Sequence, residues 1–340
     1  MTLLLTRSLI TELLDPDTVM AGLHAGFLAA GPDVRPLRVR TDLPRPGTAT
    51  PRPGAATPPG PGTATPPGPG TATALLPGVI DGIPAYTVKV NAKFPDATPA
   101  LRGLVCLHDL ADGELLAVLD SATVTAWRTG LAAALATHAL AAGHAGSVSV
   151  VGAGAQARMV LQGLARLREL TRLTVCDTDP ARAAAFAAEH ERLLGIPVET
   201  AAEPRRAASR GDIVVLATWS RSPLLDASDL RPGMHVTTLG ADEPGKVELA
   251  ADALRHALTV VDDLELAVAM GALGNSGLGA DAAHASLGQV LHGERPGRES
   301  SDQITVYAPV GLPWQDLALA WPVYRAAAGA GACPQVDFLA

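Results

Sequence analysis

The chain has 340 residues, and its 34 acidic and 26 basic side chains give a formal net charge of −8 at neutral pH. This length predicts about two domains with a substantial core. Acidity and the lack of basic clusters argue against a nucleic-acid-binding surface. We find no apolar run near the roughly 18 residues of a membrane span and no secretory signal. Three scattered cysteines fit neither a disulfide framework nor a zinc site, so we expect a cytoplasmic protein with no metal and no membrane partner.

Lysine is rare in this chain. Only three of the 26 basic residues are lysines, namely Lys89, Lys93 and Lys246. On composition alone these are most simply ordinary surface lysines, and their neighbours must decide whether they do more.

Residues 44–70 contain 10 Pro and 6 Gly in a near-repeat of GTATPPGP. Such a sequence has little to bury and lacks many backbone donors, so we expect a disordered or polyproline-like surface insertion over residues 44–72. A Pro-rich ligand for a partner protein is the alternative.

The N-terminal half mixes helices with an antiparallel sheet. Apolar residues at helical spacing predict one or two helices over residues 8–29, with a possible break at Asp15–Asp17. Residues 122–142 are rich in Ala and Leu and predict a long helix whose single full charge is Arg128. Three further runs read as strands, the last two joined by an Asp112-Gly113 turn: 85–90, 103–108 and 115–120.

From Ser147 onward, short unbroken apolar runs alternate with helical stretches. This alternation is typical of a parallel sheet covered on both faces, which indicates a doubly wound nucleotide-binding domain. The five runs are SVSVVG (147–152), RLTVCD (172–177), DIVVLAT (212–218), HVTTLG (235–240) and LTVVDD (258–263).

A glycine-rich turn follows the first of these strands. Gly152 and Gly154 open a helix, with Ala157 in the third position of the dinucleotide-binding pattern. The second strand ends at Asp177, 23 residues past Gly154, where a carboxylate can accept the ribose hydroxyls. Because that carboxylate and the absence of an Arg at Thr178 disfavour a 2′-phosphate, we expect NAD, with NADP as the less favoured alternative.

Three polar residues have two interpretations each. Arg128 in its apolar helix either faces solvent or meets an anion. Lys89 in the strand TVKVN is either an edge-strand charge or a ligand-binding residue. Asp242, at the carboxyl end of the fourth parallel strand, is either a helix N-cap or a general acid/base.

Several segments together resemble the ornithine cyclodeaminase/mu-crystallin family, and the resemblance covers nearly the whole chain outside the Pro-rich insertion. The segments are LRVRT (37–41), LLP (75–77), TVKV (87–90), GELLAVLDSATVTAWRTG (113–130), VVGAGAQA (150–157), VCDTDP (175–180), LATWSRSPLL (216–225), PGMHVTTLGADEPGKVEL (232–249), GERPGRESSDQITVY (293–307) and VGLPWQD (310–316).

This resemblance implies an α/β fold with two parts and a homodimer. It implies a Rossmann-like doubly wound parallel sheet domain over residues 126–308 that is expected to bind NAD(P). It also implies a discontinuous α+β domain for substrate binding and dimerisation, made of residues 1–125 and the returning segment 309–340.

The resemblance also assigns site residues. Cations that hold the substrate carboxylate map onto Arg40, Lys89 and Arg128, and the catalytic residues map onto Asp242 and Lys89. The cofactor-binding positions map onto Thr129, Gly152, Gly154, Ala155, Gln156, Asp177, Thr178, Thr218, Ser220 and Ala241.

The expected chemistry is hydride transfer at the α-carbon of an amino or imino acid, as in an imine reductase or amino-acid dehydrogenase. The alternative is an ornithine or lysine cyclodeaminase, which releases ammonia without net oxidation. Cyclodeaminases carry a Glu where this chain has Ala74, which favours the first reading unless Asp81 or Asp96 substitutes. A non-catalytic ligand-binding protein is a minor third alternative.

Overall fold

The computed structural model describes residues 1–29, 37–43, 70–94, 97, 99–331, 333–338 and 340. Most of the predicted insertion therefore lies outside the described residues. Its last two positions are a correction, because Thr71 and Ala72 belong to a strand that pairs on both sides.

The first sheet has seven strands in the order β17-β1-β6-β5-β4-β3-β2. Its neighbours are antiparallel except β1 and β6, which are parallel. The three predicted strands are confirmed as β4, β5 and β6, whereas the other four were not predicted. The bounds are β1 (Thr2–Leu5), β2 (Leu37–Asp42), β3 (Thr71–Gly78), β4 (Ala85–Lys93), β5 (Leu101–Asp109), β6 (Leu115–Asp120) and β17 (Gln335–Val336).

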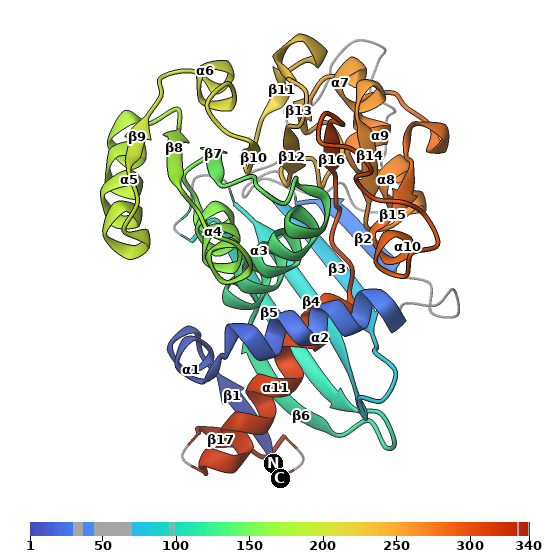
Figure 1. Ribbon diagram of the computed structural model, residues 1–340. Helices are drawn as coiled ribbons and strands as arrows, with labels where there is room; N and C mark the ends of the chain where they lie inside the picture. Colours follow the sequence, from blue (N-terminus) through green and yellow to red (C-terminus); the bar gives the residue numbers. More distant parts are fainter. Residues whose placement is uncertain (30–36, 44–69, 95–96, 98, 332, 339) are drawn as a thin grey trace, which may run out of the picture.

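Helices cover one face of this sheet, and Figure 1 shows two of them, α2 and α11, crossing it. The predicted break at Asp15 is confirmed, because the Asp15 carboxylate accepts the N–H groups of Asp17 and Thr18 and so starts a second helix. Strand residues such as Leu107 and Leu119 share one core with the helices. The helices are α1 (Arg7–Leu13), α2 (Pro16–Ala29), α3 (Ser121–Leu140) and α11 (Trp314–Ala330).

The second sheet has eight parallel strands in the order β15-β14-β16-β12-β10-β7-β8-β9. The five predicted strands are confirmed as β7, β8, β10, β12 and β14, while β9, β15 and β16 were missed. The bounds are β7 (Ser147–Val151), β8 (Arg172–Cys176), β9 (Val198–Thr200), β10 (Ile213–Leu216), β12 (His235–Thr238), β14 (Leu258–Val261), β15 (Ala285–Ser286) and β16 (Thr305–Tyr307).

Strand β10 shows that this sheet is covered on both faces. Ile213 and Val215 belong to one apolar cluster, and the alternating Val214 and Leu216 belong to another. The doubly wound sheet expected from the sequence is thereby confirmed.

The remaining elements lie between β7 and β16 in the chain, and two of them, β11 and β13, pair in a separate two-stranded sheet. They are α4 (Ala155–Leu167), α5 (Pro180–Leu194), α6 (Pro204–Ala208), β11 (Arg221–Leu225), the short helix η1 (Ala227–Asp229), β13 (Val247–Leu249), α7 (Ala251–His256), α8 (Leu264–Ala269), α9 (Ala272–Asn275), η2 (Ala280–Ala282) and α10 (Leu287–Leu291). Within the described ranges, no helix is long and apolar enough to cross a membrane.

Helix α3 joins the two sheets. Leu131 packs in the core of the first sheet, whereas Ala133 and Ala134 belong to a cluster of the second. The predicted domain boundary at residues 125/126 falls inside this helix. Its tight crossing with α4 depends on glycines: a Cβ on Gly130 would lie 2.2 Å from the Cβ of Met159.

We expect Gly130→Ala to lower the free energy of unfolding by about 1–3 kcal/mol, because the two helix backbones must separate. Urea denaturation measures this change. Gly143→Ala is the control, since nothing lies within 4 Å of the position of its Cβ. Equal stability of the two variants would contradict this account of the crossing.

Candidate active site

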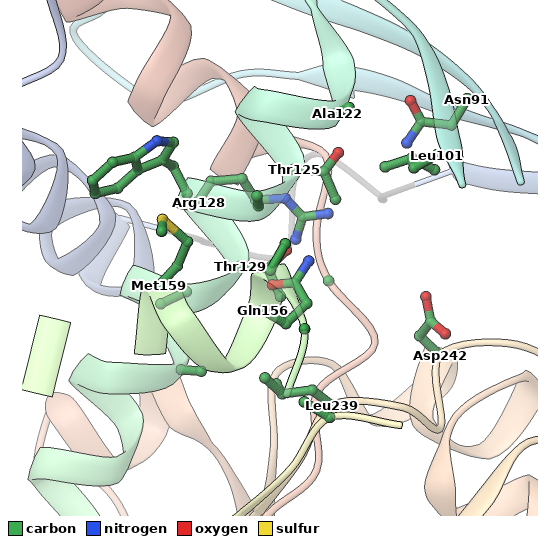
Figure 2. A pocket seen from close by; sticks show the side chains of 18 of the residues that line it. Asn91, Leu101, Ala122, Thr125, Arg128, Thr129, Gln156, Met159, Leu239 and Asp242 are labelled. Atoms are coloured by element: carbon green, nitrogen blue, oxygen red, sulfur yellow. The ribbon is translucent and has the colours of Figure 1, made fainter. Parts of the chain in front are cut away.

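A cavity of about 680 Å³ lies where the two sheets meet. The inner face of β4, helix α3, the start of α4 and the segments after β10, β12 and β16 all contribute to its wall. Figure 2 shows Asn91, Arg128 and Asp242 directed into this space from three different elements.

One wall is the turn between β7 and α4. Gly152 has a φ of +97°, and a Cβ there would lie 2.4 Å from the carbonyl oxygen of Ala217, so the turn requires glycine. Gly154 caps α4 without any side-chain hydrogen bond, which leaves the N–H groups of the first turn directed at the cavity. Since β7 lies between β8 and β10, this is the switch point at which open α/β sheets bind ligands. The turn fits a pyrophosphate group.

Asp177 lies at the end of β8, where the sequence placed it, and both its oxygens have protein partners. One accepts the Ala153 N–H at 2.8 Å, and the other accepts the Asp179 N–H and pairs with Arg182 at 2.9 Å. Burial favours the neutral carboxyl, but the two N–H groups and Arg182 outweigh it and lower the pKa of Asp177. Asp177 therefore remains ionised and ties the glycine turn to β8.

The ten predicted cofactor-binding residues divide into two groups. Five line the cavity, and five do not. The first group is Thr129, Gly154, Ala155, Gln156 and Thr218, and the second is Gly152, Asp177, Thr178, Ser220 and Ala241.

Sequence reasoning missed Glu248, a buried carboxylate behind this wall. It accepts both the N–H and the hydroxyl of Thr218, at 2.6 and 2.7 Å, and the N–H of Gly240 at 2.7 Å. Burial raises the pKa of Glu248 even though these donors oppose the shift. Glu248 holds the ends of β10 and β12 together, and its three-residue strand carries no pattern that would have revealed this.

Two clusters of charged side chains lie at the cavity. The first, which we call the inner cluster, consists of Lys89, Arg128 and Asp316. Lys89 Nζ lies 2.7 Å from Asp316, and Arg128 Nε lies 3.2 Å from the same carboxylate. Lys89 is 1% exposed. Burial lowers the pKa of Lys89 to about 7, with Asp316 opposing and Arg128 reinforcing the shift. The structure therefore excludes the interpretation that Lys89 and Arg128 are solvent-exposed charges.

The second group, the outer cluster, surrounds Asp242. Lys93, Lys246 and Arg38 lie 2.8, 3.1 and 3.4 Å from its carboxylate. Glu243 pairs with Lys93 at 2.6 Å and with Lys246 at 3.4 Å. Burial favours the neutral acid, but Lys93, Lys246 and Arg38 together hold the pKa of Asp242 well below its usual range. All three lysines of the chain thus line one cavity.

The structure places Arg38, rather than the predicted Arg40, in the cavity wall. Both point to the same side of β2, because they are two residues apart. Arg40 instead pairs with Asp42 at 2.9 Å and lies 3.9 Å from Glu243. Which arginine faces the cavity depends on the position of β2 beside β3, and that register is not readable from the sequence.

Ala74, whose lack of a carboxylate was expected to disfavour a diamino acid, does not face the cavity. Thr73 and Leu75 line the cavity, so Ala74 between them points to the opposite face of β3. The charges of the residues that line the cavity discriminate better between a cyclodeaminase and a reductase or dehydrogenase. Among the described residues that line the cavity, Asp242 is the single carboxylate; Asp81 does not line it, and Asp96 lies outside the described residues. The cationic lining residues are Arg7, Arg38, Lys89, Lys93, Arg128 and Lys246.

No group of three or more His, Cys, Asp or Glu side chains in the described part of the chain is arranged to hold a metal ion.

The model of the ornithine cyclodeaminase/mu-crystallin family matches residues 72–331. An alanine dehydrogenase of Archaeoglobus fulgidus is 33% identical over 71% of this chain and 75% of its own. A Delta(1)-pyrroline-2-carboxylate reductase of Bacillus cereus is 30% identical over 76% of this chain and 83% of its own. An L-lysine cyclodeaminase of Streptomyces rapamycinicus is 31% identical over 72% of this chain and 68% of its own.

Two solved structures share the whole architecture. One is an archaeal alanine dehydrogenase dimer with bound NAD, with a TM-score of 0.86, 28% identity and 99% coverage of both chains. The other is a Thermococcus litoralis Delta(1)-pyrroline-2-carboxylate reductase in complex with NADH and L-proline, with a TM-score of 0.85, 26% identity and coverage of 98% and 100%.

The fold and the cavity define a two-sheet α/β protein of the dinucleotide-binding type. The chain belongs to the ornithine cyclodeaminase/mu-crystallin family.

The inner cluster predicts a pH dependence. We expect a small carboxylate such as pyruvate to bind best to protonated Lys89, whose pKa is about 7 in the free protein. Above that pH binding must take up a proton, so we expect its Kd to rise by up to roughly tenfold per pH unit. Tryptophan fluorescence titrations between about pH 6 and 9 measure this, because Trp127 and Trp219 line the cavity.

Lys89→Arg is the matched variant, because a guanidinium stays charged over this range. Its Kd is expected to be independent of pH. A wild-type Kd that is also independent of pH would refute the role given to Lys89.

Proposed function

We propose that this chain is an NAD-dependent oxidoreductase acting on the α-carbon–nitrogen bond of an amino or imino acid, as an imine reductase or amino-acid dehydrogenase. The observation that carries the proposal is the convergence, on one cavity, of a pyrophosphate-binding turn, a buried Lys–Arg pair and an ionised carboxylate. Relatives with these activities, and the NAD and NADH of the two solved structures, support it.

Each side chain then has a role set by its charge. Lys89 and Arg128 bind the α-carboxylate and fix the orientation of the α-carbon. Asp242, kept ionised by its three cations, faces the positively charged substrate nitrogen and stabilises it. Lys89 Nζ exchanges a proton near neutral pH, because its pKa is about 7. NAD, when bound, supplies the hydride chemistry.

The charge of the cavity disfavours the cyclodeaminase alternative. A diamino acid carries a second ammonium group, which needs its own carboxylate partner when it leaves water. Asp242 is the single carboxylate among the described lining residues, and three cations already surround it. Six cationic residues in the same wall would repel a second ammonium.

The ionised Asp177 supports NAD over NADP, because its charge repels a 2′-phosphate. Arg182 pairs with this carboxylate and so compensates it in part.

We further propose a homodimer formed through the outer face of the first sheet. Val39, Ala74, Val90 and Leu104 form one cross-strand row over β2 to β5. Val39, Val90 and Leu104 are 53–55% exposed, and such an apolar face marks an interaction surface. The dimeric state of the archaeal alanine dehydrogenase supports this assignment.

The redox function is tested with NADH, pyruvate and ammonium, or with a cyclic imino acid. We expect NADH oxidation by the wild type and a loss of kcat/KM on the order of 100-fold or more in Asp242→Asn, because the ionised partner of the nitrogen is removed. NADH binding should be unchanged in the variant. Wild-type activity retained by Asp242→Asn would exclude the role given to this residue.

The dimer is tested by sedimentation velocity. Leu104→Arg introduces a charge into the apolar row, so we expect it to shift the protein to monomer. Leu193→Arg is the control, because Leu193 is 61% exposed on α5, away from this sheet. A wild-type monomer, or a Leu104→Arg dimer of unchanged affinity, would contradict the proposed interface.

A further inference from the structure

We infer that the substrate is dicarboxylic: an amino or imino acid whose side chain ends in a second carboxylate, which Lys93 of the outer cluster recognises. This inference rests on the proposed function and specifies its substrate class.

Both clusters contain more cations than carboxylates. In the inner cluster, Lys89 and Arg128 share the single carboxylate of Asp316. In the outer cluster, three cations face two carboxylates, namely Arg38, Lys93 and Lys246 with Asp242 and Glu243. The neighbouring Arg40 and Asp42 pair with each other and add no net charge. When every group is ionised, each cluster retains one surplus positive charge. Two separate surpluses match two anionic groups on one ligand.

Strand β4 connects the two clusters. Lys89, Asn91 and Lys93 alternate along β4 and all line the cavity. The Cα atoms of Lys89 and Lys93 are about 14 Å apart along an extended strand. Their long side chains can converge on the two ends of a short dicarboxylate. Lys93 lines the cavity with 18% of its side chain exposed, compared with 1% for Lys89, so a ligand in the cavity can contact this side chain.

Asn91 gives a third observation between these two lysines. It is 7% exposed, and its side-chain oxygen has no hydrogen-bond partner among the described residues. A buried acceptor without a partner is unfavourable, and a substrate N–H group would satisfy it. Figure 2 shows the Asn91 amide and the Asp242 carboxylate facing the same space. With the substrate nitrogen between Asn91 and Asp242, one substrate carboxylate binds the inner cluster and the other binds the outer cluster.

The substrate group beside Lys93 also has to be compatible with the positive charge of the substrate nitrogen. A positive nitrogen beside Asp242 increases the surplus charge of the outer cluster. An apolar or cationic side chain would leave that surplus uncompensated, whereas a carboxylate on Lys93 neutralises it.

The test compares oxo acids that differ by the distal carboxylate. With NADH and ammonium, kcat/KM is measured for 2-oxoglutarate and oxaloacetate and for 2-oxobutyrate and pyruvate. We expect the wild type to prefer the dicarboxylates by about 10- to 100-fold, the range of a charged hydrogen bond. Lys93→Met should lose most of this preference, and Lys93→Arg should keep it.

Arg192→Met is the matched control. Arg192 is an exposed cation on α5, away from the first sheet, and it does not line the cavity. Its removal should leave the preference unchanged. An equal loss in Arg192→Met and Lys93→Met would assign the effect to overall charge and overturn the inference.

A binding measurement decides the inference independently of turnover. The Kd values of 2-oxoglutarate and 2-oxobutyrate are measured with NADH but without ammonium, by NADH fluorescence. Tighter binding of 2-oxoglutarate that depends on Lys93 supports the inference even if no imine is reduced, an outcome that counts only against the proposed function. Equal or tighter binding and turnover of the monocarboxylates would overturn the inference and leave the proposed function standing.

Discussion

The buried ion pairs of Asp316 are the interaction on which the rest of the structure depends. This one carboxylate contacts Lys89 of β4 and Arg128 of α3, so it joins the first sheet, the helix that leads to the second sheet, and the C-terminal helix α11. Buried charges are tolerated only when they are paired, and removing one partner leaves the others uncompensated. Asp316 therefore keeps two cations inside the protein and directed at the cavity, where they can bind a carboxylate.

Two more buried carboxylates organise the opposite wall by accepting backbone N–H groups. Glu248 joins the ends of β10 and β12, and Asp262 accepts the N–H groups of Val310 and Gly311 after β16. The carbonyl of Val310 in turn accepts a hydrogen bond from Arg38. Polar contacts thus run from the dinucleotide-binding sheet to the strand that carries a cation of the outer cluster. The walls that the two sheets contribute to the cavity are thereby held in one arrangement.

The structural features that were predicted correctly from the sequence are those that depend on a local pattern of residues. Unbroken apolar runs identified five strands of the parallel sheet, and the glycine turn after β7 followed from the backbone freedom it needs. The short strands β9, β15 and β16 were missed because two or three residues carry no periodicity. The site was harder, because it depends on register: only pairing shows that Arg38 lines the cavity and that Ala74 faces away from it. Lys93 was singled out for its rarity, but its contact with Asp242 joins residues 149 positions apart.

The central claim is that the cavity carries out net hydride transfer at an α-carbon and does not recognise a second ammonium group. The most direct measurement records ammonia and NADH together, with NAD and a panel of L-alanine, L-glutamate, L-ornithine and L-lysine. The account predicts ammonia matched one-to-one by NADH, with no turnover of the diamino acids. Ammonia released from ornithine or lysine without NADH would contradict it and establish a cyclodeaminase.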